Sequence, residues 1–183
     1  TFRHAFQHVG IDFTSAFHVK EPDQEYQLRK VYIRLFTCMG SRAVHLEVAR
    51  DMTADTFLNL FIRFVSEHGP ISTIVSDNGT NFTATARFLL ELKEDPTVKR
   101  FFYKEELTWK FIRPLSPWEG GFYEIMIRQV KTALVNSMYR RALTVDQLQT
   151  LVKQCQARVN NRPLTYINSD NPIEDILTPN HLL

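Results

Sequence analysis

The chain has 183 residues, of which 44% are hydrophobic and 23% are charged, and its formal net charge is +2 at pH 7. This length and composition predict one globular domain with a sizeable core. The mildly basic balance permits nucleic-acid binding without arguing for it. No apolar run approaches the length of a membrane span, and the N-terminus has no signal-peptide layout. Cys38 and Cys155 form no CxxC pattern, so we expect reduced thiols in an intracellular protein.

The predicted elements alternate between strands and helices along the chain. β-Branched and aromatic residues predict strands at 8–17, 30–38, 43–49, 71–76 and 107–114. Apolar residues at helical spacing predict helices at 51–69, 84–95, 122–141 and 145–163. The first helix has Thr53 as its expected N-cap and ends at Gly69-Pro70.

The remaining stretches are polar, and 21–27 and the tail after Pro163 are expected to be irregular. Three strands in a meander are followed by helix, strand, helix, strand and two helices. This order describes an α/β domain with a five-stranded mixed sheet flanked by helices, which is the order of the ribonuclease-H-like fold.

Three carboxylates lie at positions where a metal site is conceivable. Asp12 is inside the first strand, Asp77 follows the fourth strand, and Glu124 begins the long helix. Each has an ordinary explanation when taken alone: a solvent-facing strand residue, an acid that begins a turn, and an acid at a helix N-terminus. Glu119, in the preceding loop, competes with Glu124 but is less suited to a fixed metal geometry.

Taken together, the three acids predict a metal centre. The first and fourth strands can be neighbours at the centre of the sheet, and the start of the long helix can approach their carboxyl ends. Gathered carboxylates repel one another unless a cation lies between them. Oxygen ligands favour Mg²⁺, with Mn²⁺ as the alternative. Two such ions suit in-line phosphoryl transfer.

The long helix adds cations beside this acid. Glu124, Arg128 and Lys131 share one face, next to an apolar stripe made of Tyr123, Met126, Ile127, Val130, Leu134 and Met138. The two cations would lie where a phosphodiester substrate must bind. The alternative is an exposed Glu–Arg pair that stabilises the helix by only about 0.3–0.5 kcal/mol.

Five stretches resemble the integrase catalytic core of retroviruses and long-terminal-repeat retrotransposons, and the Bel/Pao type most of all. They occur in the family's order and cover nearly the whole chain: VGIDFTSAF (9–17), FTCMGSRAVHLEVARDMTADTFL (36–58), GPISTIVSDNGTNF (69–82), SPWEGGFYEIMIRQVKTAL (116–134) and NNRPLTY (160–166). The gap of 46 residues between Asp77 and Glu124 is longer than in many retroviral integrases and fits an insertion at 93–107.

The resemblance implies a ribonuclease-H-like fold and an enzyme of the DDE type that processes the 3′ ends of element DNA and joins them to target DNA. Asp12, Asp77 and Glu124 would be the catalytic residues and the Mg²⁺ ligands. By the same resemblance, other residues would contact DNA or shape the active site: Arg128 and Lys131 on the helix, Asn78, Thr80 and Asn81 at the rim, and Gly120 and Gly121 in a mobile loop.

The same likeness sets expectations about context. Residues 1–183 would be the catalytic core alone, a fragment of a longer polyprotein without the zinc-binding and C-terminal DNA-binding domains. His4 and His8 form an HxxxH pair, but no CxxC follows to complete a zinc site. We expect DNA as the partner, at least a homodimer, no membrane, and action in the nucleus.

Two other functions stay open. A ribonuclease H would need a fourth carboxylate on the first helix, where Asp55 and Glu67 lie near the two ends rather than in the middle. A catalytically inactive, domesticated integrase domain would bind DNA or a protein partner without cutting, even with all three acids present.

Overall fold

The structure is a computed structural model that describes residues 4–14, 16–21, 24–76, 84–111, 128–134, 136, 143–166 and 176–183. Its strands are β1 (His8–Phe13), β2 (Phe17–Glu21), β3 (Gln24–Cys38), β4 (Val44–Ala49), β5 (Thr73–Ser76), β6 (Thr108–Phe111), β7 (Thr165–Tyr166) and β8 (Ile176–Leu177). Its named helices are α1 (Ala54–His68), α2 (Ala84–Glu94), α3 (Pro96–Lys104), α5 (Val145–Asn160) and the 3-10 helix η1 (Pro179–Leu182), and residues 128–134 are also helical. Within these ranges, no helix has the length and apolar character needed to cross a membrane.

A six-stranded mixed sheet forms the centre of the fold. The strand order is β2-β3-β1-β5-β6, and β4 also pairs with β3. The pairs β1–β5 and β5–β6 are parallel, and β3 is antiparallel to β1, β2 and β4. The predicted mixed sheet and the adjacency of the first and fourth predicted strands are therefore confirmed.

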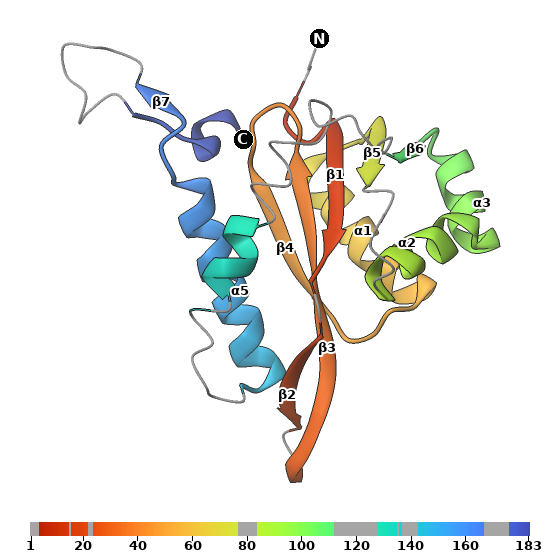
Figure 1. The fold of residues 1–183 in the computed structure, drawn as a ribbon. Helices are drawn as coiled ribbons and strands as arrows, with labels where there is room; N and C mark the ends of the chain where they lie inside the picture. The colour runs from red at the N-terminus through yellow and green to blue at the C-terminus, as the bar shows by residue number, and fades with distance from the viewer. Residues whose placement is uncertain are drawn as a thin grey trace.

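Helices cover both faces of this sheet, as Figure 1 shows. One face packs its buried side chains, including Phe36 and Cys38 of β3, against α1, α2 and α3. The other face packs Ile33 and Leu35 of the same strand against α5 and the helical residues 128–134. This division follows from β-strand geometry, because successive side chains of a strand point to opposite faces.

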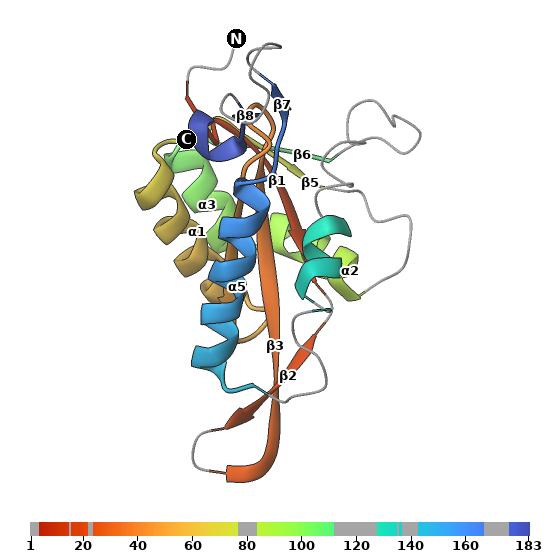
Figure 2. The same cartoon turned by 90° about the vertical axis from the view of Figure 1, so that its left-hand side faces the viewer.

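The first predicted strand is interrupted, which accounts for the sixth strand. β1 ends at Phe13 and β2 begins at Phe17, and each pairs with a different part of β3. Between them, Thr14 keeps the connection to Ile33: its N–H donates to the Ile33 carbonyl, 3.0 Å, and its hydroxyl accepts from the Ile33 N–H, 3.1 Å. β2 and the first half of β3 then form an arm that runs past the start of α5, where Lys20 pairs with Thr144 (Figures 1 and 2).

The structure differs from the predicted elements at three further places. The stretch 21–27 was expected to be a loop, but β3 begins at Gln24. The insertion-like stretch 93–107 contains a capped helix, α3, in which the Asp95 carboxylate accepts from the Thr97 and Val98 N–H groups. The tail is not wholly irregular, because β7 pairs with β8 and η1 follows. Of the predicted long helix 122–141, the structure describes 128–134 and 136, which are helical.

The ends of α1 agree with the prediction. The Thr53 hydroxyl accepts a hydrogen bond from the Thr56 N–H, 3.2 Å, as expected of an N-cap. Gly69 ends the helix with φ of 87°, a backbone conformation that favours glycine. This stop turns the chain toward β5, the strand that lies beside β1.

Side chains of α5 complete the hydrogen bonding of β4. Asn160 is buried, and its amide both accepts from the Val44 N–H and donates to the Val44 carbonyl, each at 2.8 Å. The Gln156 carbonyl accepts from the Leu46 N–H, 2.8 Å, and Lys153 donates to the Leu46 carbonyl, 2.9 Å. These contacts pair backbone groups of β4 that another strand would otherwise satisfy.

Asn160→Ala is expected to lower the free energy of unfolding by about 2–3 kcal/mol, because it removes two hydrogen bonds and leaves buried backbone groups of Val44 unpaired. Urea denaturation measures the change. Asn59→Ala, at an exposed position of α1, is the matched control and should stay within about 0.5 kcal/mol of the wild type. Equal stability of the Asn160→Ala variant and wild type would show that water replaces the amide at no cost.

Candidate active site

Asp12 is the predicted acid that the structure describes, and it lies in the central part of the sheet. Its neighbours Ile11 and Phe13 are buried on the face that packs against α1, α2 and α3. The alternation of β1 therefore turns Asp12 to the opposite face. Its side chain is 19% exposed, so the carboxylate is half-buried but reachable from solvent.

A cation from the predicted helix meets this carboxylate. The Lys131 ammonium donates to Asp12 Oδ2 at 2.9 Å. The helix is held there by Val130 and Leu134, which are fully buried against β3, β4 and α5. Arg128, one turn earlier, is exposed. The predicted face with Arg128 and Lys131 thus includes a residue that reaches Asp12 across 119 positions of sequence.

The carboxyl end of β5 lies next to Asp12. The parallel register pairs Ile11 of β1 with Ser76, the last residue of β5. Ser76 is buried, and its hydroxyl accepts a hydrogen bond from the Trp109 indole N–H of β6, 2.8 Å. The end of β5 is therefore anchored on both sides. Asp77 is the next residue in the sequence.

The other predicted site residues lie outside the described residues. They are Asp77, Asn78, Thr80 and Asn81 after β5, and Glu119, Gly120, Gly121 and Glu124 before the helical residues 128–134. The structure thus brings together Asp12 and Lys131 and places the end of β5 beside them.

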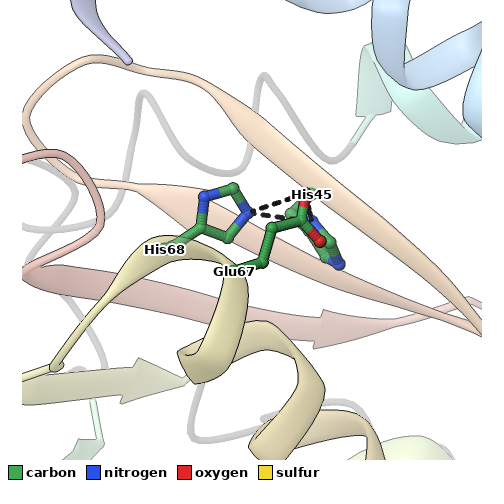
Figure 3. A group of neighbouring side chains, drawn as sticks. All are labelled: His45, Glu67 and His68. Carbon is green, nitrogen blue, oxygen red and sulfur yellow. Dashed lines mark hydrogen bonds and ion pairs between the residues drawn. The ribbon is translucent and has the colours of Figure 1, made fainter.

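A second polar cluster, which the sequence did not predict as a unit, lies on the other face of the sheet. It contains His45 of β4 and Glu67 and His68 from the last turn of α1 (Figure 3). Burial, and then the neighbouring His45, lower the pKa of His68 to about 4. The one signal in the sequence was the Glu-His pair directly before the Gly69-Pro70 stop, and nothing local connected it to His45.

Glu47 supports this cluster from β4. Burial opposes its ionisation, but hydrogen bonds from His45 and Lys153 lower the pKa of Glu47 to about 2. The carboxylate contacts His45 Nε2 at 3.2 Å and Lys153 Nζ at 2.9 Å, and Arg63 lies 3.5 Å away. The Glu47 carboxylate is therefore ionised and holds the His45 ring by a hydrogen bond.

A cleft of about 940 Å³ opens between β4, α1 and the start of α5. Charges of both signs line it, including Arg50, Asp51, Arg63 and Asp146. Asp12 and Lys131 are not among its lining residues. Because its charges are mixed, this cleft is not a better candidate for the active site than the sheet face that carries Asp12.

The fold is the ribonuclease-H-like fold of integrase catalytic cores. The bovine immunodeficiency virus (BIV) integrase core domain superposes with a TM-score of 0.61 at 15% identity, over 96% of this chain and 92% of that one. The HTLV-2 integrase catalytic core in complex with magnesium, in its trimeric form, has a TM-score of 0.61 at 13% identity, over 100% of this chain and 99% of that one. No family model and no curated protein sequence matches the chain.

One chain of a larger assembly has a similar fold as well. A chain of the simian T-cell lymphotropic virus intasome, in complex with the PP2A regulatory subunit B56 gamma, has a TM-score of 0.66 at 14% identity. The match covers 98% of the present chain but only 54% of the viral one. At these identities the likeness concerns the fold, and the function has to be argued from the residues of this chain.

Proposed function

We propose that the chain is a metal-dependent polynucleotidyl transferase: the catalytic core of a retroelement integrase of the Bel/Pao type that processes element DNA ends and joins them to target DNA. The observation that carries the proposal is the arrangement around Asp12. A half-buried carboxylate at the centre of the sheet lies beside the end of β5 and contacts a helix cation, Lys131. The integrase cores with the same fold support it.

The residues around Asp12 suit a magnesium site. Asp12 already binds a cation, the Lys131 ammonium, which supports a local preference for positive charge. In the proposed site Asp12, Asp77 and Glu124 would hold Mg²⁺, or Mn²⁺, by hard carboxylate oxygens. Bound there, the metal would neutralise charge and activate the attacking oxygen. The HTLV-2 core with the same fold was solved with magnesium.

The proposal assigns a role to each of the chain's own site residues. Asp12 is presented by a central strand that pairs with β3 on one side and β5 on the other, so its carboxylate is well positioned. Arg128 and Lys131 would bind phosphates of the element's DNA end, and Lys131 would exchange the Asp12 carboxylate for a phosphate. By resemblance to integrase cores, Asn78, Thr80 and Asn81 would form the rim of the site, and Gly120 and Gly121 would belong to the loop before the catalytic helix. A nucleophilic side chain is unnecessary, because water or a DNA 3′-hydroxyl attacks the phosphodiester.

Lys131→Gln is expected to weaken binding to duplex DNA at every sequence tested. Loss of one phosphate contact weakens the salt dependence, so the negative slope of log affinity against log salt should become shallower by about 1. Fluorescence anisotropy over a salt series measures both quantities. Lys104→Gln, at the exposed end of α3, is the control. An unchanged slope in the Lys131→Gln variant would contradict phosphate binding by Lys131.

A branched DNA that mimics the joined product tests the enzymatic proposal without knowledge of the natural end sequence. The reverse of strand transfer releases one arm and reseals the target strand, and the same site must catalyse both directions. We expect release with Mg²⁺ or Mn²⁺ and none with EDTA. Absence of release with either metal, in a chain that binds the DNA, would overturn the proposal. Cleavage of an RNA–DNA hybrid instead would identify a ribonuclease H.

A second function is favoured by one specific contact. The Lys131 ammonium neutralises the Asp12 carboxylate, and a domesticated domain that binds DNA or a protein without cutting could keep this ion pair permanently. Such a domain would bind the branched DNA with the same affinity in EDTA and in Mg²⁺ and release nothing.

The context of the enzyme follows the same proposal. Two DNA ends have to be joined, so the chain would act as at least a dimer. It would act in the nucleus, as the catalytic core of a longer polyprotein.

A further inference from the structure

Three potential metal ligands converge between β4 and the end of α1 (Figure 3). His68 Nε2 lies 3.0 Å from His45 Nδ1. Glu67 Oε1 lies 3.8 Å from His45 Nδ1 and 3.7 Å from His68 Nε2. The three donor atoms thus form a triangle with two similar sides and one shorter side, built from residues 45, 67 and 68 on two different elements.

This triangle has the dimensions of a tetrahedral zinc site. Zinc binds imidazole nitrogen and carboxylate oxygen at about 2.0–2.2 Å, so ligand atoms of one tetrahedron lie about 3.3–3.6 Å apart. The observed distances fall on either side of that value. A hydrogen bond explains the short distance between the two histidines. It does not explain the position of the Glu67 carboxylate oxygen, which is too far from both nitrogens to accept one.

The surroundings orient His45 as a ligand. Its Nε2 faces the Glu47 carboxylate at 3.2 Å, so the proton belongs on that nitrogen and the lone pair of Nδ1 points into the triangle. Lys153 and Arg63 hold Glu47 in turn. A carboxylate behind a histidine is the arrangement that raises ligand basicity and fixes ring orientation in zinc sites.

Aromatic packing fixes the rings further. The Phe6 ring lies over His68 with centroids 4.3 Å apart, and Phe64 packs against both imidazoles at 4.9 and 5.1 Å. His45 itself is buried. Glu67 is 57% exposed and closes the cluster on the solvent side, where a water molecule can complete the coordination.

We propose that His45 Nδ1, His68 Nε2 and Glu67 Oε1 bind one Zn²⁺, with water as the fourth ligand. Two imidazoles and one carboxylate favour zinc over Mg²⁺ or Ca²⁺, which prefer an all-oxygen shell. The site differs from the Asp12 site in both metal preference and position, because Asp12 faces the other side of the sheet. A bound ion would join the last turn of α1 to β4 and stabilise the chain just before β5.

Zinc binding to the metal-stripped, untagged chain tests the proposal. We expect one Zn²⁺ per chain by equilibrium dialysis, a higher melting temperature with Zn²⁺, and visible absorption of tetrahedral Co²⁺ after substitution. Glu67→Gln and His68→Gln should each weaken zinc binding by more than about tenfold, because even partners outside the ligand shell contribute factors of about 10–100. Glu67 is exposed, so its variant keeps the fold.

Matched controls separate this site from others. Glu91→Gln and His18→Gln remove the same groups from exposed positions of α2 and β2 and should bind zinc like the wild type. Asp12→Asn should also bind it unchanged, which keeps this outcome independent of the proposed catalytic centre. The proposal is overturned if no stoichiometric zinc binds, if binding survives both Glu67→Gln and His68→Gln, or if Asp12→Asn alone abolishes it.

Discussion

Asp77→Asn is expected to reduce release from branched DNA by roughly 1,000-fold or more, since a lost metal ligand costs several kcal/mol of transition-state stabilisation. The amide matches the carboxylate in size but provides one neutral oxygen donor. Asp77 directly follows Ser76, which pairs with Ile11 in the parallel register. Asp12→Asn is expected to cause the same loss.

The melting temperature provides a second measurement of this variant. Bound Mg²⁺ relieves repulsion among the carboxylates and should raise the melting temperature of the wild type. The rise should disappear in Asp77→Asn, while the metal-free variant keeps its fold. Asp55→Asn, an exposed acid in the first turn of α1, is the control with unchanged activity. Full activity of Asp77→Asn would refute its role as a metal ligand.

Phe61→Ala should cause the largest loss of stability, about 3–5 kcal/mol, because it removes a buried aromatic ring and leaves a cavity. Phe61 is fully buried in the middle of α1. Its ring contacts Phe57 and Phe64 of the same helix, Phe36 of β3 and Phe102 of α3. One side chain therefore joins the sheet to two helices.

The neighbouring Ile62 provides the control. It is 45% exposed, so Ile62→Ala should change the free energy of unfolding by only about 0.5 kcal/mol. Guanidinium denaturation of both variants gives the comparison. For a domain of this size, the Phe61→Ala loss corresponds to a fall in melting temperature of roughly 10 °C. Similar stabilities of the two variants would mean that the aromatic cluster repacks without a cavity.

The centre of the fold was predictable because its signals are local. β-Branched and aromatic residues predicted β1, β4 and β5, and the order of elements then allowed the strand of Asp12 to lie beside β5. The arm was harder. Residues 24–27 of β3, Gln-Glu-Tyr-Gln, are mostly polar, so no hydrophobic pattern distinguished a strand from a loop.

Arg34 shows what a strand pattern leaves open. The sequence alternates around it, which places Val31, Ile33 and Leu35 on one face of the strand but does not say what lies opposite. In the structure Arg34 is fully buried, and its guanidinium lies 4.4 Å from the centre of the Phe13 ring. Burial lowers the pKa of Arg34 to about 9 despite the attraction of Asp51. The aromatic rings around the guanidinium belong to other strands and helices, so the local sequence could not predict this burial.

The candidate site was predictable only in part. The helical spacing of Arg128 and Lys131 indicated one face, and the structure adds the contact of Lys131 with Asp12. The roles of Asp77 and Glu124 stay predictions, because both lie outside the described residues. The His45 cluster was not predictable, because it depends on how α1 crosses β4.

The hydrogen bonds from Lys153, Gln156 and Asn160 to β4 also determine how this part of the molecule can open. The outward amides of an edge strand normally exchange with solvent hydrogen whenever water reaches them. Here the Val44 and Leu46 amides are held by side chains of α5, so their exchange requires that helix to detach. The margin of the sheet and α5 therefore form one cooperative unit, which opens together or not at all.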